Sequence, residues 1–136
     1  MLKRFTVSME EDLLDDFDSF IQDRHYKNRS EALRDLIRGR SIEKEWQADK
    51  DVMGVISLVY DHHQHKLQEK VTDLQHDFHS QIVSTTHVHM DHHNCLEVII
   101  VRGKAGEVRG LADSLTAMRG VRNASLSMSS TGKDLH

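Results

Sequence analysis

Residues 82–101 read IVSTTHVHMDHHNCLEVIIV, two strand-like stretches on either side of a polar turn. Polar and apolar side chains alternate over residues 82–90, which is the pattern of a strand with one buried face. Residues 96–101 are rich in branched apolar side chains and are typical of a buried strand. Because residues 91–94 between them are short and polar, the sequence predicts a β-hairpin here.

The stretches around this hairpin complete a βαββαβ order. Residues 52–60 are rich in Val, Ile and Leu and predict a buried strand before it. Apolar side chains then recur at helical spacing over residues 67–78. After the hairpin, the turn at residues 103–106 leads into a second helix, Gly120 is expected to cap it, and residues 121–128 predict the last strand. This is the order of the ferredoxin-like fold, so we expect the α+β class.

A different unit precedes these elements. Residues 2–9 alternate like a half-buried strand, and residues 11–23 place apolar side chains at helical spacing behind an acidic first turn. Residues 28–31, Asn-Arg-Ser-Glu, resemble a capping box and start a second helix. The predicted organisation is a strand-helix-helix domain over 1–46, a short hinge at 47–51, a ferredoxin-like domain over 52–128 and a frayed tail at 129–136.

The N-terminal unit predicts a dimer that binds DNA. A lone strand cannot satisfy its backbone hydrogen bonds, and so small a unit cannot bury a core alone, but two chains that pair their strands solve both problems. Such β-ribbons read the major groove. The polar face would present Arg4, Thr6 and Ser8 to base edges, and the exposed helix start would seat a phosphate on Asn28, Arg29 and Ser30. The alternative is that these polar side chains are only the solvent-exposed face of an edge strand and bind nothing.

Composition restricts the class of protein. The 136 residues carry a formal charge of −4 from 18 basic and 22 acidic side chains, a balance that excludes a disordered polyelectrolyte. No apolar run is long enough to span a membrane, and the acidic start is not that of a signal peptide. A single cysteine excludes an intramolecular disulfide and suits a reducing cytoplasm, where we expect the protein to act.

Histidine marks the candidate site. The chain has 11 histidines, and most of them lie between His62 and His93. His87 and His89 are two positions apart on the predicted strand, so they project from one face about 7 Å apart. The hairpin returns the only thiol, Cys95, near this pair. Two imidazoles and a thiolate are metal ligands, so we predict a metal site. The alternative is a small buried cysteine beside two exposed histidines.

Three ligands leave a fourth position open. The candidate donors are the remaining histidines of this region, His62, His63, His65, His76, His79, His92 and His93. A histidine from a neighbouring subunit is easier to place than one from the helix of the same chain, and it would couple metal binding to assembly. A tetrahedral site would favour zinc, whereas a planar one would favour nickel or copper.

The chain resembles the NikR family of nickel-responsive transcriptional regulators over about residues 3–128. The matching stretches are RFTVSMEEDLLDDFD, YKNRSEALRDLIR, SLVYDHH, IVSTTHVHMDHHNCLEVIIVRG and RGVRNASL. HVH-x5-CLE after a strand that ends in VYDH is close to a signature of the family. The resemblance implies a ribbon-helix-helix domain joined to an ACT-like metal domain, in a homotetramer built as a dimer of dimers.

The resemblance also implies residue roles. One Ni²⁺ per subunit would be bound in a plane by His87, His89 and Cys95 of one subunit and His76 of another, with support from Tyr60, His62 and Glu97. Arg4, Thr6 and Ser8 match the base-reading strand. Glu31 and Asp35 match acidic positions proposed for K⁺ or another cation between the domains. Gln64 and His65 stand where the family has basic residues that contact the DNA backbone.

These parts predict a nickel-dependent repressor. Nickel would order the metal domain and favour arrangements in which both ribbons reach a pseudo-palindromic operator of nickel-uptake genes, a shift of population between states. The alternatives are a nickel-storage protein, an enzyme that uses Cys95 with a histidine, and a regulator that senses an organic effector. No motif for an organic substrate is visible, so we do not expect an enzyme. Because no apolar run is long enough to span a bilayer, we also expect no membrane partner.

Overall fold

The computed structural model describes residues 1–64 and 66–136. It divides into two compact units, residues 1–39 and residues 40–136. The division falls inside helix α2 (Arg29–Gln47) and not at the predicted hinge, so the domain boundaries drawn from the sequence stay a prediction. None of the described helices is both long and apolar enough to cross a lipid bilayer.

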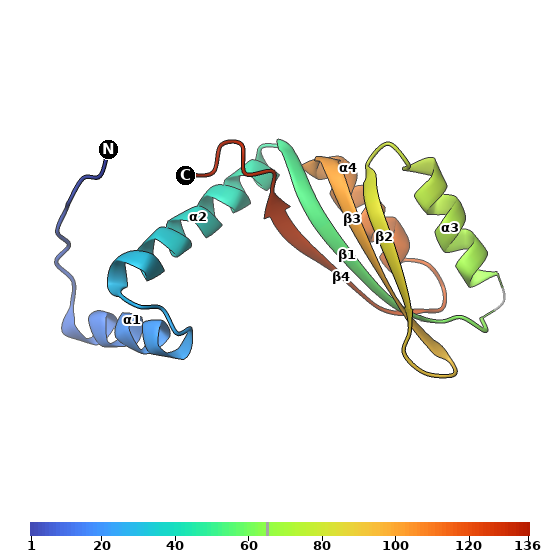
Figure 1. Ribbon diagram of the computed structural model, residues 1–136, viewed down its shortest axis with the longest axis horizontal. Coiled ribbons are helices and arrows are strands. Elements are labelled where there is room, and N and C mark those ends of the chain that lie inside the picture. Colours follow the sequence, from blue (N-terminus) through green and yellow to red (C-terminus); the bar gives the residue numbers. More distant parts are fainter. Residues whose placement is uncertain (65) are drawn as a thin grey trace. The chain divides into compact units, whose positions relative to one another are not determined.

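The first unit contains α1 (Glu11–Asp23) and the start of α2 (Figure 1). The predicted cap of α2 is present, because the Asn28 side chain accepts the Glu31 backbone N–H at 2.9 Å. Arg29 donates two hydrogen bonds to the Asp18 carboxylate, both at 2.9 Å, and so ties the start of α2 to α1.

Residues 1–10 are extended and exposed, and they pair with no strand in the described chain. The strand predicted over residues 2–9 is therefore absent here, because the ladder partner that it needs would come from a second chain. Apolar side chains of this unit are left in solvent: Phe5 is 70% exposed and Leu13 is 57% exposed. Pairing of the N-terminal segments stays a prediction.

The second unit confirms the βαββαβ order. Its elements are β1 (Asp51–Asp61), α3 (Leu67–Asp77), β2 (Ile82–His89), β3 (Asn94–Lys104), α4 (Ala105–Thr116) and β4 (Val121–Ser130) (Figure 1). The strands form one antiparallel sheet in the order β2-β3-β1-β4, so β2 is an edge strand.

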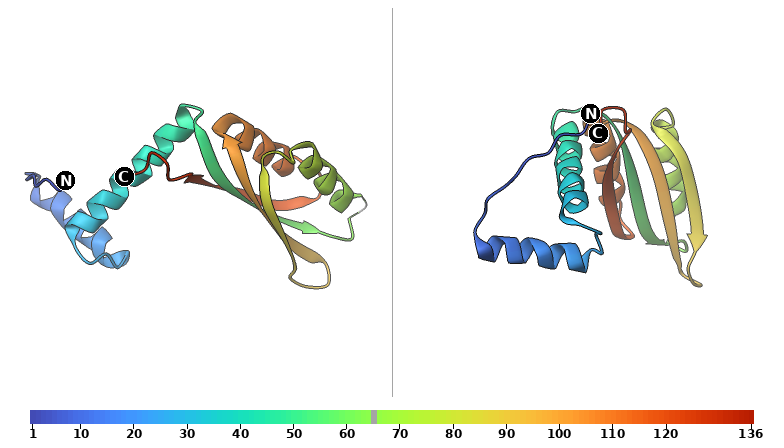
Figure 2. Two further views of the ribbon diagram at one scale, coloured as in Figure 1. Left: turned by 45° about the horizontal axis from the view of Figure 1, so that its top comes forward. Right: turned by 60° about the vertical axis from the view of Figure 1, so that its left-hand side comes forward.

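The core of the second unit lies between one face of the sheet and the two helices α3 and α4 (Figure 2). Every second residue of β1 is buried, as the alternation of a one-sided sheet requires. Ile56 and Ile99 meet Val71 of α3 and Leu111 of α4 in a single apolar cluster. Cys95 belongs to this buried face, which places the thiol at the margin of the core.

Two boundaries differ from the sequence prediction. Helix α4 ends at Thr116, before the predicted cap, and Gly120 instead takes a left-handed φ of 100° in the turn into β4. A Cβ at this position would also lie 2.8 Å from the Gln64 side chain, so only glycine fits. Strand β4 extends to Ser130, into the stretch expected to fray.

The end of α2 belongs to the second unit. Trp46 is buried in its core, and its indole N–H donates to the Ser129 carbonyl at 2.9 Å. The Asp49 carboxylate accepts the Gly106 backbone N–H at 2.7 Å, which caps the start of α4. Both contacts fix the segment around residues 46–51 to the sheet domain.

Candidate metal centre and nucleic-acid interface

The β2–β3 hairpin places Cys95 beside His89. The register pairs His89 with Cys95 and His87 with Glu97, and residues directly opposite on antiparallel strands share a face of the sheet. The Cys95 Sγ lies 3.3 Å from His89 Nδ1. The thiol and the imidazole are thus side by side, as the HVH-x5-C spacing predicts.

His62 joins the same cluster from the end of β1. Tyr60 is opposite Cys95 in the β1–β3 ladder, and His62 Nδ1 lies 3.4 Å from Cys95 Sγ. In residues 1–64 and 66–136, only His62, His89 and Cys95 form a group of three or more such donors within 4.8 Å of one another. The sequence analysis gave His62 as a candidate donor and as a supporting residue of the site, and the β1–β3 register brings it beside the thiol.

Burial and nearby carboxylates hold the Cys95 thiol in its protonated form. Removal from water raises the pKa of the thiol, and the negative charges of Asp61, Glu97 and Asp91 raise it further. A thiol in such surroundings is not a reactive nucleophile. A cation that binds the sulfur would have to displace its proton, so metal binding here would release a proton.

His87 has the environment of a metal-ligating imidazole. Its Nδ1 faces the Tyr60 hydroxyl at 3.4 Å and the Glu97 carboxylate at 3.9 Å. Its Nε2 is buried and has no hydrogen-bond partner among the described residues. If Nδ1 carries the proton, Nε2 is a free acceptor, which is how outer partners orient metal-bound histidines. The unpartnered nitrogen and the neighbouring thiol fit a late transition metal.

Tyr60 and Glu97 form the polar backing of His87. The Tyr60 hydroxyl donates to Glu97 at 3.4 Å, and burial, followed by the charges of Glu97 and Cys95, raises the pKa of the Tyr60 hydroxyl well above its usual range. Tyr60 therefore stays neutral and remains a donor. Glu97 is the one charged residue that is buried in the described part of the chain.

His76 lies apart from this cluster. It is exposed near the end of α3, and its ring stacks on that of His79 at a centroid distance of 6.0 Å. The two rings line a shallow pocket with Thr72, Gln75 and Ile82. A role as the fourth ligand therefore requires a second subunit, which is the role that the family resemblance implies and which stays a prediction.

The other candidate histidines lie at the hairpin end. His63, His92 and His93 are exposed, and their rings contact one another. His65, which the sequence analysis named as a candidate donor and as a departure from the family's basic helix start, lies outside the described residues.

The expected DNA-reading side chains lie on the exposed N-terminal segment. Arg4 and Thr6 line a pocket with Ser30 at the start of α2. Phe5, Val7 and Met9 line an adjacent groove together with Ser8 and the apolar side chains Leu14, Phe17 and Leu33. The helix start therefore lies next to the segment that carries the base-reading candidates.

Two of the residues predicted to bind a DNA phosphate already make contacts within the chain. The Asn28 side chain caps α2, and the Arg29 guanidinium is held by Asp18. This pairing lowers the pKa of Asp18 and raises that of Arg29, so both groups stay charged at neutral pH. Asp18 lies in the middle of α1 and Arg29 at the start of α2, so local spacing does not predict this ion pair.

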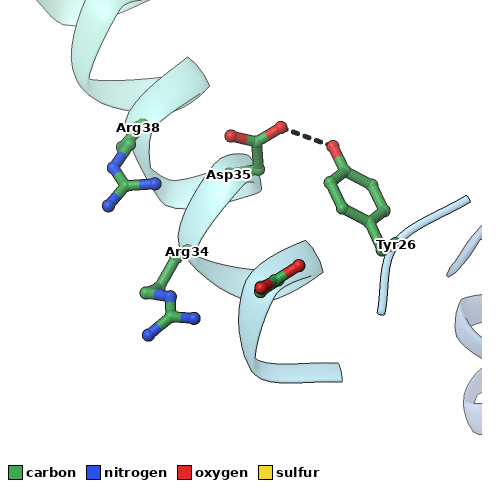
Figure 3. Close-up of a pocket in the computed structure, with 5 residues that line it drawn as sticks. Tyr26, Arg34, Asp35 and Arg38 are labelled. Atoms are coloured by element: carbon green, nitrogen blue, oxygen red, sulfur yellow. Dashed lines mark hydrogen bonds between the residues drawn. The ribbon is translucent and has the colours of Figure 1, made fainter. Parts of the chain in front are cut away.

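Glu31 and Asp35 line a small pocket of the first unit. Its volume is about 270 Å³, and Tyr26, Arg34 and Arg38 line it as well. The Tyr26 hydroxyl donates a hydrogen bond to the Asp35 carboxylate (Figure 3). Arg34 and Arg38 lie on the same helix as Asp35, α2. Two guanidinium groups beside two carboxylates balance the charge of this pocket, which weakens the attraction for a cation.

Both parts of the chain match known domain families. Residues 3–40 match the ribbon-helix-helix proteins of the copG family, and residues 53–129 match the NikR C-terminal nickel-binding domain. Part of the chain is also similar to the solved structure of an uncharacterized protein from Thermotoga maritima. That similarity has a TM-score of 0.53 and 15% identity, and it covers 58% of this chain and 98% of that one, so it supports the fold alone.

Relatives match the chain from end to end. A protein of Desulfotalea psychrophila named as a nickel-responsive regulator is 66% identical over 136 residues, which is 100% of both chains. Proteins of the same name from Syntrophus aciditrophicus and Geobacter sulfurreducens are 52% and 49% identical, cover 96% and 98% of this chain, and are themselves covered over 95% and 96% of their lengths.

The relatives are named as nickel-responsive regulators, and this chain itself matches a DNA-binding domain family, which points to a transcription factor and not to an enzyme. More than half of the chain, residues 53–129, matches the nickel-binding domain model, and residues 3–40 match the ribbon-helix-helix one. The chain therefore belongs to the NikR family of nickel-responsive regulators.

Proposed function

We propose that this chain is a nickel-dependent transcriptional repressor that works as a homotetramer in the cytoplasm. Nickel bound at the subunit interface orders the metal domains and favours the arrangement in which both DNA-binding dimers reach a pseudo-palindromic operator of nickel-uptake genes. The effect is a population shift, because nickel binds one arrangement better than the others. Its partners are nickel and double-stranded DNA, with no membrane and no organic substrate.

One observation carries the proposal: a buried thiol and an unpartnered imidazole nitrogen lie on neighbouring strands of one hairpin. Cys95 Sγ is 3.3 Å from His89, and the buried Nε2 of His87 lacks a partner in the described chain. An unsatisfied buried polar atom costs free energy unless a ligand completes it. We therefore propose His87, His89 and Cys95 as ligands, with Tyr60 and Glu97 orienting His87.

His76 of another subunit and His62 of the same chain compete for the remaining position. The proximity of His62 to Cys95, at 3.4 Å, favours a site within one chain. Two exposed apolar side chains of the edge strand β2 favour assembly, because Val83 is 59% exposed and Val88 is 43% exposed. We propose His76 as the ligand and His62 as a supporting residue that contacts the thiol, with one nickel ion per subunit.

The DNA-binding part of the proposal uses the dimer of N-terminal segments. Phe5 and Leu13 are exposed in one chain, and burying such side chains against a second copy would supply the missing core. Arg4, Thr6 and Ser8 then face the major groove and read bases. Asn28, Arg29 and Ser30 lie at the phosphate backbone, where the Asp18 carboxylate offsets the charge of Arg29.

The proposal also includes a cation such as K⁺ at Glu31 and Asp35. Two carboxylates one helical turn apart support it, since oxygen ligands suit hard cations. The neighbouring Arg34 and Arg38 oppose it. A dependence of operator binding on K⁺ that is lost in Glu31→Gln would support this site.

Equilibrium dialysis combined with an operator gel shift tests the function. We expect one saturable nickel ion per chain and operator binding that tightens when nickel is added. Several ions per chain without DNA preference would favour nickel storage, and binding that ignores nickel but responds to an organic molecule would favour an organic effector.

The matched pair His62→Gln and His76→Gln tests the ligand assignment. Loss of a ligand should weaken nickel binding by more than the 10–100-fold that an outer partner costs. We expect the larger loss in His76→Gln, together with loss of the tetramer's response to nickel. A larger loss in His62→Gln would place the whole site within one chain.

A further inference from the structure

Three histidines outside the proposed nickel site gather where two loops meet. His63 follows β1, whereas His92 and His93 occupy the turn between β2 and β3. The ring of His63 lies 5.4 Å from that of His92 and 5.4 Å from that of His93, and the His92 and His93 rings are 4.9 Å apart. All three side chains are exposed and so can take up a ligand.

The backbone beneath these rings is fixed by hydrogen bonds. The His62 N–H donates to the His93 carbonyl at 3.0 Å and joins the two loops. The Asp61 carboxylate accepts the His63 N–H at 2.9 Å, and the Asp91 carboxylate accepts the His93 N–H at 2.8 Å. The Cα positions are therefore set, and only the exposed rings need to turn, which rotamer changes allow at low cost.

The ring spacing fits one tetrahedral metal ion. A metal–nitrogen bond of about 2.0–2.1 Å puts each imidazole centroid about 3.2 Å from the ion. Two rings at a tetrahedral angle are then about 5.2 Å apart, whereas two rings at a right angle are about 4.5 Å apart. The observed separations of 4.9, 5.4 and 5.4 Å agree with the tetrahedral value.

One ring already has the outer hydrogen bond of a metal ligand. His63 Nε2 lies 2.9 Å from the His92 carbonyl, so Nε2–H donates and Nδ1 is left as an acceptor. Metal-bound histidines usually donate their second ring N–H to a carbonyl or carboxylate, which fixes the tautomer. The Asp61 and Asp91 carboxylates add negative charge nearby.

We propose that His63, His92 and His93 form a second metal site, for a divalent d-block cation that accepts tetrahedral nitrogen ligation, as Zn²⁺ does, with water as the fourth ligand. The donor nitrogens do not yet converge in the described chain, where only the cluster around Cys95 is gathered within 4.8 Å, so the ion would draw the rings together. Binding would join the loop after β1 to the turn before Cys95. The His63 ring also lies 4.0 Å from the ring of His62, so this second site adjoins the proposed nickel site but uses different ligands.

Zinc titration of the nickel-loaded protein tests this site. The protein is first loaded with nickel and dialysed, then zinc is added, and bound zinc and nickel are both counted by elemental analysis. We expect one further zinc per chain with nickel retained. Zinc binding should weaken at least about 10-fold in each of three variants: His63→Gln, His92→Gln and His93→Gln. The reason is that removing a metal ligand lowers the metal affinity more than removing a residue that only hydrogen-bonds to a ligand. His79→Gln is the matched control, because it removes an exposed histidine of α3 outside the trio.

Three results would overturn the proposal: no saturable zinc, zinc that displaces nickel ion for ion, or zinc binding that survives all three substitutions. Loss in His79→Gln equal to that in the trio would also overturn it. The same titration on Cys95→Ala, without nickel, separates this proposal from the nickel site, because the zinc step should remain there even if the protein binds no nickel.

Discussion

Replacement of Trp46 should destabilise the sheet domain, although this residue lies in a helix that begins in the DNA-binding unit. Trp46 is 1% exposed, donates its indole N–H to the Ser129 carbonyl at 2.9 Å, and packs beneath the Arg109 guanidinium, 5.6 Å from the ring. Removing a buried aromatic side chain costs about 3–5 kcal/mol. Trp46→Ala should therefore remove a large part of a total stability of about 5–15 kcal/mol.

A second variant separates the hydrogen bond from the packing. Trp46→Phe keeps most of the apolar contact but leaves the Ser129 carbonyl without its donor, which should cost about 1–3 kcal/mol. Gln47→Ala, at the exposed neighbouring position, is the control and should stay within about 0.5 kcal/mol of the parent.

Urea unfolding measures these changes. Far-UV circular dichroism is the suitable signal, because Trp46 is the only tryptophan and its removal abolishes the usual fluorescence probe. With slopes of about 1–3 kcal/mol/M, Trp46→Ala should lower the midpoint by at least about 1 M at equal protein concentration. An unchanged midpoint in Trp46→Ala, or an equal loss in Gln47→Ala, would refute the assignment of this helix end to the sheet domain.

Three further outcomes are expected. Cys95→Ala should abolish the one-per-chain uptake of nickel in equilibrium dialysis, and an unchanged titration would remove the proposed site. Arg4→Ala should weaken specific DNA binding in gel shifts by about 1–3 kcal/mol while nickel uptake stays intact, whereas loss of both would indicate unfolding. Hydrogen bonds from the Asn94 side chain, the Asn94 backbone N–H and the His93 backbone N–H lower the pKa of Asp91 from 3.8 to about 2. The stabilisation that they give is complete above the unfolded pKa and is lost as the pH falls through about 2. The stability difference between the parent and Asp91→Ala should therefore shrink on acidification from pH 4 to pH 2, and a constant difference would contradict this origin.

The sequence predicts the sheet domain well because its pattern and its partners lie on one chain. The strand pattern over residues 82–90 and the short polar turn were enough to predict that Cys95 returns near His87 and His89, and the hairpin register then pairs it with His89. His62 was harder to place, because its approach to the thiol depends on the pairing of Tyr60 with Cys95 between strands distant in sequence.

Other features lie beyond what local patterns can predict. Residues 2–9 alternate like a strand, yet a single chain offers them no ladder partner, so residues 1–10 form no strand in this chain. Trp46 reads as the end of a helical stripe, and only the tertiary structure shows that it fills the core beside β4. The local sequence of residues 47–51 likewise does not predict that Asp49 caps α4, because its partner, Gly106, lies far along the chain.

The unpaired N-terminal segment has a consequence for gene control in a growing cell. If the base-reading surface forms only when two copies meet, a newly made polypeptide is silent at its promoter until a mate arrives. The concentration of the regulator then sets a floor below which nickel cannot be sensed at all.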